Sequence, residues 1–175
     1  LPSGAPDYTP EVHFENMEKR ARKIRSAASE VKRMRLLERF GDRGAPLVIL
    51  GWGSTIGPVR EAVARAQQEG MQIEVLYTKL IFPLPRDQIA EFIAGRKAIL
   101  VPELNHTGQY ARMIQAEFWR EVVSFRKFGG IPFTTQEIYG RIKQIYDAKC
   151  KPKVRARAAR SLPARRAKKR IIRKA

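Results

Sequence analysis

Cysteine and histidine are scarce in this sequence, which holds one Cys and two His among 175 residues. The single thiol, Cys150, cannot form an internal disulfide, and an iron–sulfur cluster needs about four thiolates. His13 and His106 lie far apart in the sequence and far from Cys150, so the spacing typical of a metal site is missing. The absence of a CxxC partner disfavours a redox role for Cys150. We expect no metal ligands, and a reducing, cytoplasmic location.

Long hydrophobic runs are also missing. No segment approaches the roughly 20 apolar residues that span a bilayer, so we expect no membrane partner. The amino terminus lacks the basic segment and apolar run of a secretory signal. It also lacks an initiator Met. We therefore expect a piece of a longer protein: a truncated form, a processed fragment or one product of a split gene.

Acidic residues are absent from the end of the chain. Residues 149–175 contain 13 Lys or Arg and no Asp or Glu, whereas the rest carries 35 − 13 = 22 basic against 17 acidic residues. Such a block is typical of a solvated or partner-binding extension. This basic tail has no aromatic residue to stack on bases, so any contact with nucleic acid would be nonspecific. A binding module that uses the tail on nucleic acid or an acidic protein is one candidate function.

Residues 1–44 are expected to form a lead-in followed by a long helix. Thr9 is a suitable N-cap, and Pro10 fits the first helical position. The helix would pack one face on its own domain or a neighbouring one, or form a free coiled coil, until residues 41–44 end it. The apolar residues of that face, at spacings that alternate three and four, are Phe14, Met17, Ala21, Ile24, Ala28 and Val31.

Residues 45–148 alternate strand-like and helix-like segments, which predicts right-handed βαβ units and a mostly parallel sheet. We therefore expect an α/β fold of three layers, with the sheet flanked by helices. Thr134 and Glu137 have the spacing of a capping box that begins the last helix. Strands are predicted at 46–50, 72–77, 98–101 and 122–128, and helices at 58–69, 85–94, 108–121 and from 135 onward.

A glycine-rich loop follows the first predicted strand, where doubly wound sheets bind ligands. Its spacing is GxGxxxG, which differs from the dinucleotide pattern GxGxxG, and no Walker Lys-Ser/Thr pair follows. Either a tight turn with close helix–strand packing or contact with an anion explains such a loop. A stand-alone nucleotide-binding enzyme is a further alternative. The candidate residues of this loop are Gly51, Gly53, Ser54, Thr55 and Gly57.

Two further loops follow predicted strands. The first contains Phe82, a candidate interface residue, and the prolines Pro83 and Pro85 after it rigidify the loop. The second contains Glu103, Asn105 and Gln109, which could bind a partner, a ligand or one another. His106 lies in the same loop, but a lone Glu beside a lone His is no catalytic pair without supporting geometry. We assign no catalytic residue and no cofactor-binding residue.

These loops, in this order, resemble a known family. The chain is similar over about residues 5–147 to the transketolase-carboxy-terminal-like domain of 2-oxoacid:ferredoxin oxidoreductase alpha subunits, with the 2-oxoglutarate branch nearest. The segments that carry the resemblance are Tyr8–His13, Glu18–Lys23, Val48–Thr55, Gly57–Ala62, Pro83–Pro85, Glu103–Asn105 and Gly108–Gln109.

The resemblance implies an enzyme complex that oxidatively decarboxylates a 2-oxoacid with coenzyme A, giving acyl-CoA and CO2, and reduces ferredoxin. Thiamine diphosphate, Mg and iron–sulfur clusters would serve that complex. The thiamine would lie between an upstream alpha-subunit domain and the beta subunit, so this chain alone would bind no cofactor and be inactive. The resemblance implies a scaffold at a subunit interface, with the rest of the alpha subunit and the thiamine-binding beta subunit as partners.

Overall fold

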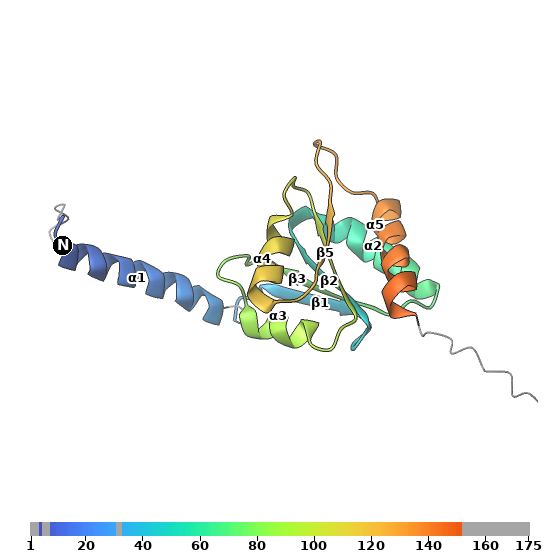
Figure 1. Ribbon diagram of the computed structural model, residues 1–175, viewed down its shortest axis with the longest axis horizontal. Coiled ribbons are helices and arrows are strands. Elements are labelled where there is room, and N and C mark those ends of the chain that lie inside the picture. Colours follow the sequence, from blue (N-terminus) through green and yellow to red (C-terminus); the bar gives the residue numbers. More distant parts are fainter. Residues whose placement is uncertain (1–3, 5–7, 31–32, 152–175) are drawn as a thin grey trace, which may run out of the picture.

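The computed structural model describes residues 4, 8–30 and 33–151 of the chain. In this part, a five-stranded sheet has helices on both faces and is preceded by a separate helix (Figure 1). In chain order the elements are α1 (Pro10–Ser29), β1 (Leu37–Gly41), β2 (Leu47–Trp52), η1 (Gly53–Thr55), α2 (Ile56–Gln68), β3 (Ile73–Thr78), α3 (Arg86–Ile93), β4 (Ala98–Glu103), α4 (Gln109–Phe118), β5 (Val123–Arg126), α5 (Thr135–Ile145) and the π-helical turn η2 (Tyr146–Cys150).

The strand order is β1-β3-β2-β4-β5, with β1 antiparallel at one edge and the other four strands parallel. The chain passes from β2 outward to β3 and then returns across β2 to β4. The direction of winding therefore changes beside β2, as in other doubly wound sheets. We call the side of the sheet where the four parallel strands end the carboxyl edge; it is marked by Trp52, Thr78, Glu103 and Arg126.

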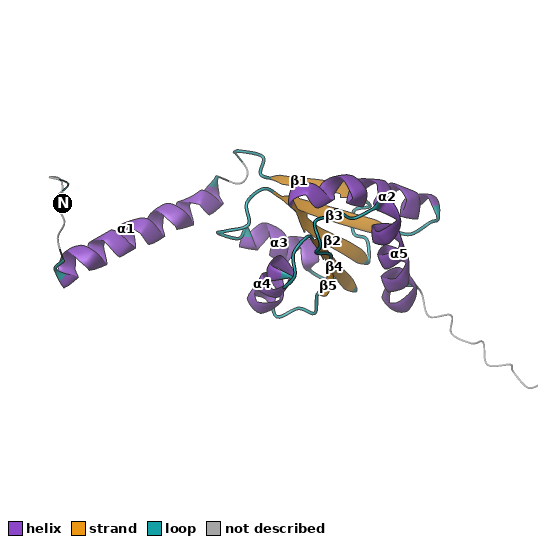
Figure 2. Cartoon of the chain, turned by 90° about the horizontal axis from the view of Figure 1, so that it is seen from above, coloured by secondary structure: helices purple, strands orange, loops and turns teal. Residues whose placement is uncertain are grey.

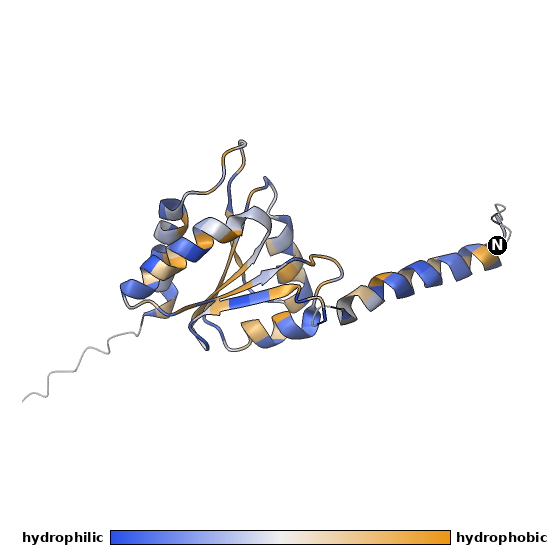
Figure 3. Cartoon of the chain, turned by 180° about the vertical axis from the view of Figure 1, so that it is seen from behind, coloured by the Kyte–Doolittle hydropathy of each residue, from blue (hydrophilic) through white to orange (hydrophobic). Residues whose placement is uncertain are grey.

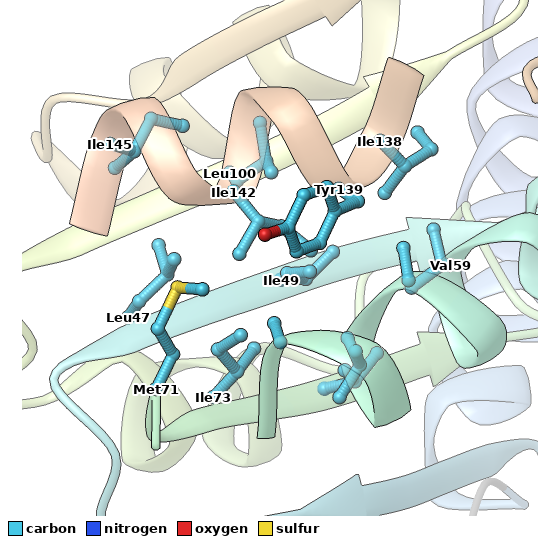
Figure 4. Close-up of a cluster of buried hydrophobic side chains, with 14 of the residues drawn as sticks. Leu47, Ile49, Val59, Met71, Ile73, Leu100, Ile138, Tyr139, Ile142 and Ile145 are labelled. Atoms are coloured by element: carbon cyan, nitrogen blue, oxygen red, sulfur yellow. The ribbon is translucent and has the colours of Figure 1, made fainter. Parts of the chain in front are cut away.

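Helices cover both faces of the sheet, so the central strands β3 and β4 are buried along their whole length (Figure 2). α2 and α5 pack on one face, where Ile49 of β2 meets Val59 of α2 and Ile142 of α5 (Figure 4). α3 and α4 cover the other face with Phe92 and Ile114. Full burial of such side chains contributes about 1.5–3 kcal/mol each. The predicted three-layer, mostly parallel α/β fold is confirmed.

The predicted helix ends are largely confirmed. Thr134 caps α5: its Oγ1 accepts a hydrogen bond from the Glu137 N–H at 3.2 Å, and the Thr134 N–H donates to Glu137 Oε2 at 2.7 Å. α4 ends at Phe118 rather than at residue 121, because Trp119 adopts a left-handed φ of 51° that stops the helix. None of the described helices is both long and apolar enough to cross a membrane.

The first forty residues differ from the prediction. The long helix ends at Ser29, and residues 37–41 form strand β1. Leu37 and Phe40 are three residues apart and mimic a helical face, but pairing with β3 overrides local propensity. The predicted boundary at residue 44 thus falls between two strands of one sheet, and we place the start of the α/β domain before Leu37.

Helix α1 projects away from the sheet, with its apolar and polar residues alternating along its surface (Figures 1 and 3). Phe14, Met17 and Ile24 are 68%, 48% and 46% exposed. The expectation that this face packs on the chain's own domain is therefore wrong for the described residues, whereas packing on another molecule or domain stays a prediction. Val31 and most of the basic tail, residues 152–175, lie outside the described part.

Candidate functional site

The fold brings the three predicted loops to the carboxyl edge of the sheet. The glycine-rich loop follows β2, the Phe82 loop follows β3, and the Glu103 loop follows β4. The change in winding direction opens the sheet between β2 and β4, where such folds bind ligands. The sequence thus placed its candidate residues on the correct edge, and their contacts show what each one does.

Packing explains the glycine-rich loop. A β-carbon on Gly51 would run into the ring of Tyr77 on β3, so only glycine fits. The Tyr77 hydroxyl hydrogen-bonds the Thr55 hydroxyl, which also donates to the Trp52 carbonyl oxygen at 3.2 Å. Burial raises the pKa of Tyr77 to about 12, so the hydroxyl stays protonated. Gly53 has a φ of +65°, which is typical of a tight turn.

Three candidate residues of this loop face solvent: Gly53, Ser54 and Gly57 are exposed. A β-carbon on Gly57 would meet no atom within 4 Å. Of the two explanations given by the sequence, the contacts of Gly51 and Thr55 favour a tight turn with close packing over an anion site.

The loop after β4 is bound to its own helix. Glu103 is 1% exposed, and its carboxylate accepts hydrogen bonds from the backbone N–H groups of Tyr110 at 2.8 Å and Ala111 at 3.0 Å. Asn105 donates to the same carboxylate at 2.9 Å and accepts from the Gly108 N–H at 2.6 Å. A carboxylate at a helix amino end is stabilised by the helix dipole. Glu103 and Asn105 therefore hydrogen-bond to each other and to the amino end of α4.

The other polar residues of this loop stay at the surface. The Gln109 side chain is exposed, and the ring of His106 lies against Phe128 with ring centroids 4.4 Å apart. The structure brings Glu103 and Asn105 together, but Gln109 joins them only through its backbone N–H, 3.4 Å from Asn105 Oδ1. Among the described residues no hydrogen bond joins the His106 side chain to Glu103, so the two do not form a catalytic pair.

Exposed apolar side chains gather along the carboxyl edge. Phe82 is 69% exposed and lines a pocket of about 260 Å³ with Met113 of α4. Leu104 after β4 is 37% exposed, and Phe128 and Ile131 after β5 are 62% and 68% exposed. Apolar side chains concentrated on one edge are typical of an interaction surface. We call Phe82, Leu104, Phe128 and Ile131 the apolar rim.

A second pocket at this edge was not predicted. It has a volume of about 310 Å³ and lies between the ends of β2 and β3, beside the point where the winding direction changes. The Nε1 atom of Trp52 in its lining is buried without a hydrogen-bond partner among the described residues. The sequence offered one signal for this pocket, the aromatic residue Trp52 within the glycine-rich motif. The lining residues are Glu38, Trp52, Gly53, Ile56, Tyr77, Thr78, Lys79 and Ile81.

Sequence reasoning also missed a buried ion pair at the opposite edge. Glu74, at the start of β3, is completely buried and accepts hydrogen bonds from Arg39 Nε at 2.6 Å, the Gly44 N–H at 3.0 Å and an Arg96 nitrogen at 3.1 Å. Burial alone would raise the pKa of Glu74, but the hydrogen bonds from Arg39 and Gly44 lower it below its usual value. This network joins β1, β3 and the loop between α3 and β4, so its position indicates a structural role.

The cofactors implied by the resemblance need ligands that this part of the chain does not offer. Among the described residues, no group of three or more His, Cys, Asp and Glu could hold a metal ion. Cys150 is buried, and burial raises the pKa of its thiol. One buried thiol does not fit an iron–sulfur cluster. The Glu103 carboxylate is fully engaged, so it does not fit a Mg site for thiamine diphosphate.

Fold and loops together define a three-layer α/β domain in which Glu103, Asn105 and Thr55 at the carboxyl edge hydrogen-bond to other parts of the domain itself. Residues 45–138 match the family model described as pyruvate:ferredoxin oxidoreductase core domain II. The chain belongs to this family, which the alpha subunits of 2-oxoacid:ferredoxin oxidoreductases share.

Relatives carry names from the same family. The chain is 29% identical over 136 residues to 2-oxoglutarate oxidoreductase subunit KorA of Mycobacterium tuberculosis, covering 78% of this chain and 20% of the relative. It is 28% identical over 102 residues to subunit alpha of 2-oxoacid:ferredoxin oxidoreductase 1 of Aeropyrum pernix, covering 57% and 16%. The chain thus spans about a fifth of the length of these curated relatives.

A solved structure agrees with this family. The 2-oxoglutarate:ferredoxin oxidoreductase from Magnetococcus marinus, solved with 2-oxoglutarate, coenzyme A and succinyl-CoA bound, superposes with a TM-score of 0.72 at 38% identity. The match covers 81% of this chain and 24% of that one. The predicted resemblance to 2-oxoacid:ferredoxin oxidoreductase alpha subunits is confirmed.

Proposed function

We propose that this chain is a non-catalytic scaffold and interface domain of a thiamine-diphosphate-dependent 2-oxoacid:ferredoxin oxidoreductase, with 2-oxoglutarate as the substrate of the complex. The complex would form acyl-CoA and CO2 and reduce ferredoxin. The family membership and the match to a 2-oxoglutarate enzyme support this assignment. Thiamine diphosphate, Mg and iron–sulfur clusters would be held by other parts of the complex, and we place the complex in the cytoplasm.

The contrast between polar and apolar groups at the carboxyl edge carries the proposal. The polar residues of this edge, Glu103, Asn105 and Thr55, are used by the domain itself. In contrast, no element of the described domain covers the apolar rim, which is exposed to solvent. Polar groups that are already satisfied leave little for a substrate to bind, whereas exposed apolar side chains gain free energy when a partner covers them. An interface with the thiamine-binding subunits fits this arrangement.

Reconstitution tests the proposal. The chain would be combined with the rest of the alpha subunit and the beta subunit, and the reduction of ferredoxin would be followed with 2-oxoglutarate and coenzyme A. We expect no turnover from the chain alone and full turnover only when the three parts assemble. Turnover by the isolated chain would overturn the non-catalytic role, and turnover that needs no addition of the chain would overturn the scaffold role.

A matched pair of substitutions locates the interface. Phe82→Ala removes a rim side chain and is expected to weaken assembly, measured as the concentration of chain that gives half-maximal turnover. Trp119→Ala is the control, because Trp119 is 91% exposed, follows the last residue of α4 and does not line the pocket that contains Phe82. Equal effects of the two substitutions would contradict an interface at the rim.

The basic tail supports a second candidate function, contact with nucleic acid or an acidic protein such as ferredoxin. Its 13 positive charges and lack of acidic residues favour salt-sensitive binding. The test compares the chain with a variant lacking residues 152–175, which removes 11 of these 13 charges and keeps Lys149 and Lys151. Ferredoxin-dependent turnover and RNA binding that are both unchanged by the deletion would remove this candidate.

A further inference from the structure

The apolar stripe of α1 has the period of a coiled coil. Phe14, Met17, Ala21 and Ile24 follow one another at spacings of three, four and three residues. This is the 3.5-residue period of positions a and d in a heptad, and it is narrower than the stripe of a helix that packs on a globular core. Phe14, Met17 and Ile24 are 68%, 48% and 46% exposed, so no described residue of the chain provides the partner helix that such a stripe packs against.

The charges of α1 are separated along its axis. Residues 10–18 contain three acidic residues and no Lys or Arg, whereas residues 19–29 contain five basic residues and no acidic one. Such a helix carries a negative amino-terminal half and a positive carboxy-terminal half. The acidic residues are Glu11, Glu15 and Glu18, and the basic residues are Lys19, Arg20, Arg22, Lys23 and Arg25.

This distribution selects the partner and its orientation. Two copies of α1 side by side in the same direction would place like charges against like charges along their whole length. Two copies in opposite directions place the negative half of each against the positive half of the other, while their apolar stripes face each other. We propose that α1 binds α1 of a second copy of this chain as an antiparallel two-stranded coiled coil.

The proposal goes beyond the interface at the carboxyl edge and does not depend on it. α1 projects away from the sheet, so two copies can meet along it without contact between their α/β domains (Figure 1). The helix has 20 residues and is about 30 Å long, and the stripe from Phe14 to Ile24 covers about 15 Å of this length. The pairing covers Phe14, Met17 and Ile24, and the opposing charges at the flanks fix the direction.

The mass of the full chain in solution tests the pairing. Analytical ultracentrifugation is expected to show twice the mass of one chain. Met17→Gln with Ile24→Gln should reduce this to a single mass, whereas Asn16→Gln with Ser26→Gln, at exposed and uncharged positions of the same helix outside the stripe, should leave the dimer intact. A wild-type chain that stays at a single mass, as expected if another domain of a larger complex covers α1, would overturn the proposal.

Charge reversal tests the orientation. One variant replaces the three acidic residues of the first half with Lys, and the other replaces the five basic residues of the second half with Glu. Each variant alone should be monomeric, because every orientation now opposes like charges, and an equimolar mixture should recover a dimer. Circular dichroism of each variant monitors whether α1 stays helical. Half-reversed chains that still dimerise alone would overturn the antiparallel arrangement, because only a parallel pair already tolerates like charges along its whole length. A mixture that fails to dimerise while both helices stay folded would overturn the proposed charge pairing.

Discussion

The ring of Tyr77 lies where a β-carbon on Gly51 would have to stand. The two residues are partners in the register of the parallel strands β2 and β3, and the ring crosses the adjacent strand at its last buried position. The hydroxyl at the end of that ring then reaches Thr55 at the start of α2. The glycine therefore lets one aromatic side chain connect two strands and a helix, and this packing accounts for the first glycine of the GxGxxxG motif.

Gly51→Ala should therefore destabilise the domain. The new methyl group collides with the Tyr77 ring, which is held between buried neighbours, and such overpacking costs about 1–3 kcal/mol. Urea unfolding followed by far-ultraviolet circular dichroism measures the change. Gly57→Ala is the matched control, because it lies in α2 with open space around it and should raise the free energy of unfolding by about 0.5 kcal/mol. Equal effects of the two substitutions would contradict the packing explanation.

The sequence pattern alone predicted an element correctly where local propensity and tertiary packing favour the same structure. The apolar runs of β2 and β4 predicted buried strands, and the Thr134–Glu137 spacing predicted the start of α5. Strand β1 escaped prediction because its sequence, Leu-Glu-Arg-Phe-Gly, has no alternation of polar and apolar residues. Its strand structure depends on hydrogen bonds to β3 and on the ion pair of Arg39 with Glu74, which are 35 residues apart in sequence. Contacts of this kind cannot be inferred from the local pattern.

The sequence predicted where the candidate residues lie in the fold but not which contacts they make. Parallel strands bring their carboxyl ends to one edge, so the order of strands and helices sufficed to place Gly51 and Glu103 there. What the sequence could not show is that Glu103 binds the amino end of its own following helix, because that depends on the loop geometry between residues 104 and 108.

Glu103→Gln should loosen the amino end of α4. The amide keeps the size of the side chain but replaces one acceptor oxygen with a donor, which then faces the N–H groups of Tyr110 or Ala111. A buried donor without an acceptor costs about 1–3 kcal/mol. Hydrogen exchange of the α4 amides should also accelerate. Gln109→Ala, an exposed change in the same loop, should alter the free energy of unfolding far less; similar losses would show that Glu103 does not hold the helix.

Glu74→Gln should destabilise the domain more than any other neutral-amide substitution in the described sheet. It removes the only buried carboxylate that Arg39 and Arg96 both contact in the described chain, and loss of one partner from a buried pair costs about 3 kcal/mol. Chemical unfolding would measure this cost. Glu121→Gln serves as a control, because Glu121 pairs with Lys149 at an exposed site and should contribute little. A small effect of Glu74→Gln would mean that water, or a movement of the backbone, supplies other hydrogen-bond acceptors to the guanidinium groups of Arg39 and Arg96.

The capping box gives a prediction for pH. Hydrogen bonds from Lys127 and then from the Thr134 N–H lower the pKa of Glu137 from 4.5 to about 2. Because the pKa is lower in the folded state, the ionised carboxylate stabilises the protein above about pH 4.5, and this contribution is lost as the pH falls toward 2. Glu137→Gln keeps a side chain that can complete a capping box but removes the charge.

Thermal unfolding of wild type and Glu137→Gln across this pH range tests the assignment. We expect a higher Tm for the wild type near neutral pH and a difference that shrinks between pH 4.5 and about pH 2, the interval set by the two pKa values of Glu137. Other carboxyl groups titrate in both proteins, so they cancel in the difference. Lys127→Met removes the first cause of the lowered pKa but keeps the hydrogen bonds from Thr134, so it should flatten the acid side of the wild-type profile in part. A difference that stays constant down to the lowest pH would show that the charge of Glu137 does not contribute, and that its cap acts through neutral hydrogen bonds alone.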